Sequence, residues 1–372
     1  MASTIIPIND PKAVARWSAA LFVDIARESF YDSALTGQGQ NAMTPFVALT
    51  DLESKAGDTI KYDLNLQLKG KPAHGDVRIT GTEENLRFAS DELKIDLIGK
   101  SVSAGRTMTQ KRTLHDLRSV ARDRQKDYWA RLSDEYKTMY LSGARGVNAD
   151  FVEDIGFTGF AGNALTAPST SHHLFGGNAS AFNDIDSNDK ADLKLLDRAV
   201  TKSKTMGGGS TNVPRIRPIK WKGQERWVAV FHPYQIYDIR TNTSTAQWLD
   251  IQKAAAGAEG QQNPIFRGSH GAYNGVVIQE HDTVLLFDNA GSAVNQPAAR
   301  ALFLGRQAGV IAYGSPGSGQ RIKWREDLED RGRELIVTAE MICGIKKTRF
   351  TVDGTARDFG VMALDTYATA PV

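Results

Sequence analysis

The sequence predicts an α+β fold built from two or three compact subdomains. Its 372 residues are enough for that number at about 100 to 200 residues for each domain. Apolar and polar side chains alternate between residues 57 and 97, which indicates strands. A long helical pattern covers Thr113–Leu141, and the later strand and helix patterns do not alternate as a parallel βαβ fold requires.

The composition is that of a folded, soluble protein. Apolar residues make up 41% and charged residues 24%, and the net charge of +2 gives no overall signature of a dedicated nucleic-acid-binding protein. No window approaches the roughly 18 consecutive apolar residues of a membrane span, and the first residues lack the layout of a secretory signal. We therefore expect a cytoplasmic protein without membrane contact. The single cysteine, Cys343, is expected to be a buried structural thiol.

The first 55 residues are expected to form an arm. Apolar side chains recur at helical spacing over Lys12–Phe30, and Ser33–Thr44 is rich in glycine and glutamine. The helical piece has an apolar face but no local partner in the sequence, so we expect it to dock on a neighbouring subunit. Trp17 and Phe22 are the candidate contacts on this face.

A long hairpin is predicted over residues 56–105. Alternation runs from Ile60 to Leu68 and returns at Val77–Ile79 and Leu93–Leu97, with the turn-forming segment Lys69–Gly75 at the tip. An isolated two-stranded hairpin is marginal in water, so this one should lie on its own domain or on a neighbour. Candidate intersubunit contacts at the tip are Lys69, Lys71 and His74.

The strongest helical pattern, Thr113–Leu141, is expected to be a spine of about 40 Å. Thr113 followed by Asp116 resembles a capping box, and Gly143 supplies the C-terminal stop. Its apolar stripe is expected to begin at Leu114.

Arg118, Arg122 and Lys126 form a basic stripe on the spine helix, and like charges four residues apart repel each other. Either nearby acids such as Asp123 and Asp127 or acids of a neighbouring subunit offset these charges, or the stripe faces DNA. The solvated or intersubunit face is the preferred interpretation.

The remainder of the chain mixes loops, helices and strands. Residues 144–188 are predicted to be surface loops, and Asp189–Met206 a second helix. A hairpin is predicted over residues 215–231. Further expected elements are helices at Pro233–Arg240 and Ala246–Ala256 and strands at Gly275–Gln279, Thr283–Phe287, Val310–Tyr313, Glu334–Ile342 and Lys346–Val352.

The motifs predict no catalytic, cofactor or metal site. The glycines of Gly314–Gly319 lack the Lys-Ser/Thr of a phosphate-binding loop, and the acidic run from Asp184 lacks the glycine and glutamate of a calcium loop. His172 and His173 have no further ligand at zinc-like spacing. Two alternatives stay open: an enzyme whose catalytic triad is assembled only by the fold, and a DNA-binding module that uses the basic stripe.

Several segments, taken in order, resemble a known family. They are Phe46-Val47, Gly57-Asp58-Thr59-Ile60, Leu68–Gly75, Gly81–Leu86, Met108–Thr113, Phe231–Gln235, Gly271–Val276 and Leu304–Ala308. Through these segments the chain is similar to the major capsid proteins of tailed bacteriophages with the Hong Kong 97 fold, in the branch typified by the coat protein of phage N-four.

The resemblance implies a division of the chain into five segments. They are an N-terminal arm (1–55), an E-loop hairpin (56–105), a peripheral domain with the spine helix (106–230), an axial domain (231–321), and return strands of the peripheral domain with the C-terminus (322–372).

The resemblance also implies a structural protein and not an enzyme. Hexamers and pentamers would form an icosahedral head shell around double-stranded DNA, assembled in the host cytoplasm and retained in the virion. A separate scaffolding protein, a portal and a decoration protein are the implied partners. A covalent crosslink finds no support, since Lys69 and Lys71 have no identifiable partner in the sequence.

Overall fold

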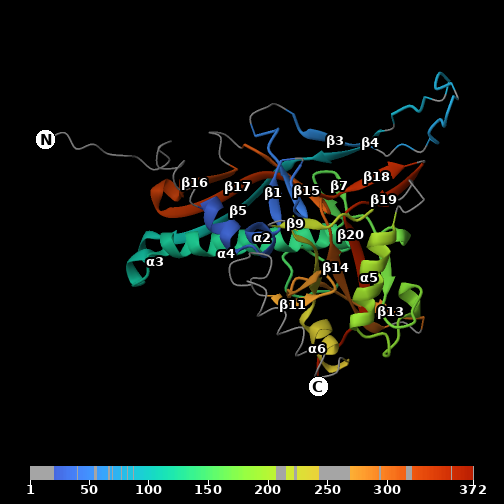
Figure 1. Ribbon diagram of the computed structural model, residues 1–372. Helices are drawn as coiled ribbons and strands as arrows, with labels where there is room; N and C mark the ends of the chain where they lie inside the picture. The colour runs from blue at the N-terminus through green and yellow to red at the C-terminus, as the bar shows by residue number, and fades with distance from the viewer. Residues whose placement is uncertain are drawn as a thin grey trace.

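The computed structural model confirms the α+β class. Most strands belong to two sheets, one of six and one of eight strands, and the long helix α4 (Leu117–Ser142) contacts both (Figure 1). The structure describes residues 21–371 apart from 40, 54–56, 66, 67, 69, 77, 82, 87, 207–214, 222, 223, 243–268, 293, 294, 316–320 and 353.

The six-stranded sheet is organised around its longest strand, β17. β17 pairs with β15, β16 and β5, all antiparallel, and β2 extends the sheet beyond β15 in parallel. Its members are β1 (Thr36–Gln38), β2 (Phe46–Leu49), β5 (Asp96–Arg106), β15 (Gly309–Gly314), β16 (Ile322–Glu329) and β17 (Glu334–Lys347).

The eight-stranded sheet has the order β11-β12-β10-β14-β20-β8, with β13 paired to β14 and β9 to β10. The predicted ranges 231–321 and 322–372 each supply strands to both sheets, and the five-segment division stays a prediction. The strands are β8 (His173–Phe175), β9 (Ile219–Trp221), β10 (Gln224–Phe231), β11 (Ser269–Tyr273), β12 (Val276–Glu280), β13 (Leu285–Ala290), β14 (Gln296–Leu304) and β20 (Val361–Tyr367).

Helix α4 ends where the sequence predicts but begins later. Gly143 adopts the left-handed conformation that closes the helix, as expected. The predicted start at Thr113 is wrong: the side chain of Asp116 accepts a hydrogen bond from the backbone N–H of Arg118, while Thr113 is extended and ends a separate short helix, α3 (Thr107–Arg112). Leu114, expected on the buried stripe, is fully exposed in the turn between the two helices.

The hairpin is confirmed, with shorter strands than predicted. β3 (Thr59–Asn65) pairs antiparallel with β4 (Phe88–Lys94), and the connection between them projects from the body of the molecule (Figure 1). The strand expected at Val77–Ile79 is wrong, because its described residues, 78 and 79, are not in a strand.

The described part of the arm lies on its own subunit. Residues 21–28 are helical, and α2 (Phe30–Ala34) follows. Leu21 and Ile25 are buried in the main apolar cluster together with α4 and the six-stranded sheet. A partner distant in sequence therefore covers this part of the apolar face, and docking of the arm on a neighbouring subunit stays a prediction.

Two shorter helices cover one face of the eight-stranded sheet. α5 (Leu193–Thr205) and α6 (Pro233–Asn242) lie close to their predicted positions and share an apolar cluster with the sheet. The helix predicted at Ala246–Ala256 lies outside the described residues.

Residues 144–188 are mainly loops, as predicted, with the short strands β6 (Gly159–Phe160) and β7 (Asn163–Ala164). These loops are not wholly at the surface, since Asn163 and His172 are buried. A small hairpin of β18 (Arg349–Val352) and β19 (Thr355–Asp358) follows β17. Cys343 is a buried free thiol.

Replacing Gly143 with alanine is expected to destabilise the protein more than replacing Gly354. Both glycines have positive φ, +73° and +77°, a conformation that costs an alanine about 1 to 2 kcal/mol. A Cβ on Gly143 would also lie 1.8 Å from the carbonyl oxygen of Thr166, whereas one on Gly354 meets no atom within 4 Å. Denaturant unfolding should show a loss of about 1 kcal/mol for Gly354→Ala and about 3 kcal/mol or more for Gly143→Ala. Equal losses would contradict this packing.

Candidate assembly surfaces

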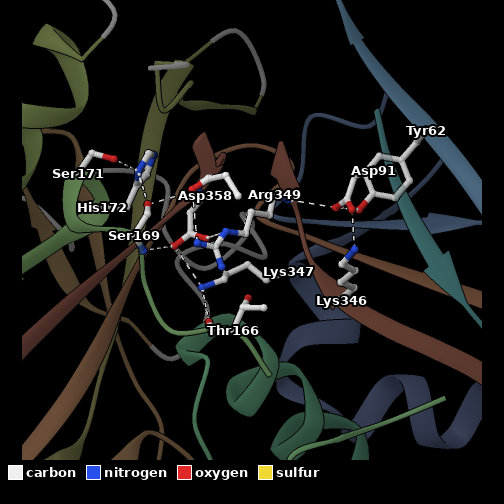
Figure 2. Close-up of polar contacts among 11 residues, drawn as sticks. Tyr62, Asp91, Thr166, Ser169, Ser171, His172, Lys346, Lys347, Arg349 and Asp358 are labelled. Carbon is white, nitrogen blue, oxygen red and sulfur yellow. Dashed lines mark hydrogen bonds and ion pairs between the residues drawn. The ribbon is translucent and has the colours of Figure 1, made fainter. Parts of the chain in front are cut away.

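The base of the hairpin is fixed to the six-stranded sheet by one carboxylate. Asp91 on β4 accepts hydrogen bonds from the Tyr62 hydroxyl (2.7 Å), the Lys346 ammonium (2.5 Å) and the backbone N–H of Arg349 (3.3 Å) (Figure 2). Burial and the charge of Asp91 raise the pKa of Tyr62 well above its usual value, so the tyrosine remains a donor. The direction in which the hairpin leaves the body is therefore set by contacts within the subunit.

A second polar group begins on β17, at the residue that follows Lys346. Lys347 and Asp358 form an ion pair at 3.1 Å, and each side chain is only 1% exposed. Lys347 also donates to the carbonyl oxygen of Thr166 (2.8 Å), and Asp358 accepts from the backbone N–H of Ser169 (2.9 Å) (Figure 2). Burial lowers the pKa of Lys347 to about 8, although Asp358 opposes the shift. The pair ties the loop at 166–169 to the β18–β19 hairpin.

The two adjacent histidines have separate roles. His172 is fully buried, with Nδ1 2.9 Å from the Ser171 hydroxyl and 3.1 Å from that of Ser169. Burial lowers its pKa to about 4, so the ring is neutral at physiological pH. His173 contacts Asp365 through Nε2 at 2.8 Å. Within the described parts of the chain, no three His, Cys, Asp or Glu residues come together to hold a metal ion.

The basic stripe of the spine helix finds its partners in the same chain. Arg118 pairs with Glu326 of β16 at 2.9 Å, and Arg122 pairs with Asp24 of the arm at 3.2 Å. Lys126 pairs with Glu28, also of the arm. These acids are distant in sequence, so the stripe alone did not reveal them. A contact of the stripe with DNA or with another subunit stays a prediction.

A buried charge cluster holds the end of the arm against α4. The carboxylate of Asp134 accepts from the Ser29 hydroxyl at 2.6 Å and from the backbone N–H of Phe30 at 2.8 Å. Lys137, fully buried, pairs with Asp32 at 2.5 Å. Burial raises the pKa of Asp134. Burial also opposes ionisation of Asp32, but Lys137 and the hydrogen bonds from Ser133 and Ser29 together outweigh it and lower the pKa of Asp32.

The candidate contact residues lie in different environments. Lys71 and His74 are exposed near the hairpin tip, while Trp17 and Lys69 lie outside the described residues. Phe22 packs edge-on against Tyr313 with ring centroids 5.7 Å apart, so its visible contact is within the subunit. The intersubunit role of these residues stays a prediction.

Sequence reasoning missed the residues that anchor the hairpin and the loop. Lys346 and Lys347 are two adjacent charges at the end of an otherwise apolar stretch, which is the one signal that could have indicated a buried ion pair. Their partners, Asp91 and Asp358, have no distinguishing pattern in the sequence.

The whole chain is similar to known capsid proteins. The phage capsid protein family matches residues 5–370. The chain belongs to this family. A capsid structure of Ralstonia phage GP4 is 43% identical, covers 100% of both chains and has a TM-score of 0.86. The chain is therefore a phage capsid protein, a structural component of a head shell in the virion.

More distant structures support the same fold. The capsid of cyanophage Pam1 is 21% identical, with 93% of this chain and 94% of that chain covered and a TM-score of 0.69. The capsid of Helicobacter pylori bacteriophage KHP30 is 13% identical, with 89% of each chain covered and a TM-score of 0.60. No curated protein sequence matches. The predicted Hong Kong 97-like fold is confirmed. Among the described helices, none has the length and apolar character needed to cross a membrane.

Acid is expected to destabilise the subunit partly through His172. Its pKa falls from 6.5 to about 4 on folding, so the unfolded chain binds the proton first. Its contribution is complete above pH 6.5 and is lost as the pH falls towards 4, by about 3 kcal/mol in total. His172→Gln should flatten the pH dependence of the unfolding free energy over this window. His74→Gln, at the exposed tip, should leave it unchanged; a parental slope in His172→Gln would refute the assignment.

Asp91→Asn is expected to loosen the base of the hairpin. The amide loses the charge that pairs with Lys346, at a cost of about 1 to 3 kcal/mol. Hydrogen exchange should become faster at the paired amides of β3 and β4 while that of α4 stays unchanged. Asp63→Asn is the matched control, because Asp63 is exposed on the same hairpin. Unchanged exchange in Asp91→Asn would show that Asp91 does not anchor the hairpin.

Proposed function

We propose that the protein assembles into hexamers and pentamers that form an icosahedral head shell around double-stranded DNA. The observation that carries this proposal is the anchored hairpin with exposed apolar side chains. Four such side chains lie on or next to its projecting connection: Leu68, Ile79, Leu86 and Phe88. Exposed apolar groups gathered on one projection are characteristic of a surface that another molecule covers.

A second group of exposed apolar side chains lies at the other end of the subunit. α3 has no buried residue, and Met108, Leu114 and Leu328 near it are all largely exposed. α3 and the hairpin connection lie at opposite ends of the molecule (Figure 1). A subunit with different adhesive surfaces at two ends makes head-to-tail contacts, and such contacts close into rings when the rotation allows.

The proposal includes the partners that a shell requires. The protein itself is the main partner, with a separate scaffolding protein, a portal and a decoration protein as further ones, and assembly takes place in the host cytoplasm. We assign the chain no catalytic role, since its relatives are capsid proteins. A monodisperse monomer with hydrolytic activity would support the enzyme alternative instead.

Deleting Lys69–Gly75 is expected to abolish or strongly reduce shell formation while the subunit still folds. The deletion shortens the projection but leaves β3, β4 and the Asp91 contacts in place. Negative-stain microscopy of the full chain, alone and with its scaffolding protein, reports rings and shells, and thermal unfolding reports the fold. Replacing the same seven positions with glycine and serine keeps the length and serves as the control for side-chain contacts. Normal shells from the deletion variant would contradict the proposed role of the tip.

A further inference from the structure

Helix α5 carries basic side chains that differ from those of the spine helix in their surroundings. Between residues 190 and 226 the sequence has ten Lys or Arg and three Asp or Glu, although the whole chain is nearly balanced at 45 and 43. Four of these basic residues, Lys194, Arg198, Lys202 and Lys204, lie on α5. Its buried face packs on the eight-stranded sheet through Leu195, Leu196, Ala199 and Val200, which leaves the opposite face towards solvent.

The solvent face of α5 is a row of cations. Lys194, Arg198 and Lys202 follow one another at intervals of four residues, about 6 Å apart along the helix. Lys194 and Arg198 are exposed and Lys202 is partly buried, and Lys204 lies beside them over the ring of Trp227 at 5.6 Å. Like charges at this spacing destabilise an isolated helix. Burial and the charge of Arg198 both lower the pKa of Lys202.

The acids on α5 and at its start are engaged elsewhere. Asp197 accepts from the Tyr273 hydroxyl (2.9 Å) and from the Asn274 side-chain amide (2.8 Å), and Asp192 caps the helix through the backbone N–H of Leu195. Among the residues that the structure describes, no carboxylate forms an ion pair with any of the four basic side chains of α5. On the spine helix, by contrast, Arg118, Arg122 and Lys126 are all paired.

Two of the cations are held in position without being neutralised. Arg198 donates to the carbonyl oxygens of Phe175 (3.1 Å) and Gly177 (3.2 Å), and Lys202 donates to that of His173 (3.1 Å). A carbonyl oxygen orders a cation but leaves its charge uncompensated. The row is therefore pre-organised for an anionic partner. The side chains of Arg198 and Lys202 lose conformational entropy when the protein folds, so binding of the partner costs less entropy.

We propose that the outer face of α5 is the surface that contacts the phosphate backbone of the packaged DNA. This inference rests on the proposed function, because the shell brings a polyanion to one side of the subunit. The exposed residues of the face include no aromatic side chain; they are Lys194, Arg198, Thr201, Lys204 and Thr205. Stacking on unpaired bases needs aromatic rings, so the face suits duplex DNA bound without sequence preference.

The test is DNA affinity of the full chain with Lys194→Gln and Arg198→Gln combined. The probe is a short fluorescent DNA duplex of mixed sequence, titrated at several salt concentrations between about 50 and 200 mM. We expect the double variant to bind at least tenfold more weakly at the low end, with a slope of log affinity against log salt that is smaller by about 1.8, because two phosphate contacts are lost.

The matched control removes two charges that are already paired. Arg124 and Arg325 are exposed but lie beside Asp127 and Asp327 at 3.6 and 2.8 Å. The combination of Arg124→Gln and Arg325→Gln should keep nearly the parental affinity and slope. Equal losses in the two double variants would show a general charge effect and overturn the proposal.

The remaining outcomes separate this inference from the shell function. If the α5 variant keeps its DNA affinity but loses binding to polyglutamate, the row recognises an acidic protein segment and the DNA assignment is wrong. Negative-stain microscopy of the same variant reports assembly independently. If the α5 variant forms shells and binds DNA as tightly as the unmodified protein, the DNA assignment alone is wrong. If the unmodified protein forms no shells, the proposed function is wrong.

Discussion

The structure depends on a helix whose last nine residues are all buried. Every residue of α4 from Asp134 to Ser142 is buried, including the charged side chains of Glu135 and Lys137. A charge without a partner in such a place costs several kcal/mol, so each charged group must find one. The partners come from separate segments, which are the arm for Asp134 and Lys137, the backbone of Val152 for Glu135, and Arg300 for the last carbonyl group.

These obligatory contacts explain the position of the arm and the state of the basic stripe. Once Asp134 binds Ser29 and Phe30, the preceding arm helix lies alongside α4. Its acids then come within reach of the stripe, where Asp24 and Glu28 neutralise two cations. The pairs themselves are partly exposed and each is worth little. Their effect is mainly to neutralise the stripe, whereas the basic side chains described on α5 have no acidic partner of this kind.

Local patterns predicted the elements that have one buried face or a clear end signal. Gly143 marked the end of α4, and the alternation from Ile60 marked β3. β14 escaped prediction because both of its faces are buried: Ala301 and Phe303 face the α5 and α6 cluster, and Leu302 and Leu304 the opposite one, so no period of two remains. The ion pairs of Asp91 and Asp358 join strands that only the tertiary fold brings together, which no local spacing encodes.

The hairpin combines an anchored base with exposed apolar side chains further out. Its base is held by Asp91, and Lys346 adds a bond to the carbonyl oxygen of Glu92. Its exposed apolar side chains Leu68, Ile79 and Leu86 lie beyond that base, and Phe88 lies at its end. Association must offset the entropy lost when a segment becomes ordered. If the tip packs on a neighbouring subunit, as proposed above, a base fixed beforehand limits that loss to the tip, and less apolar burial on the neighbour is needed to offset it.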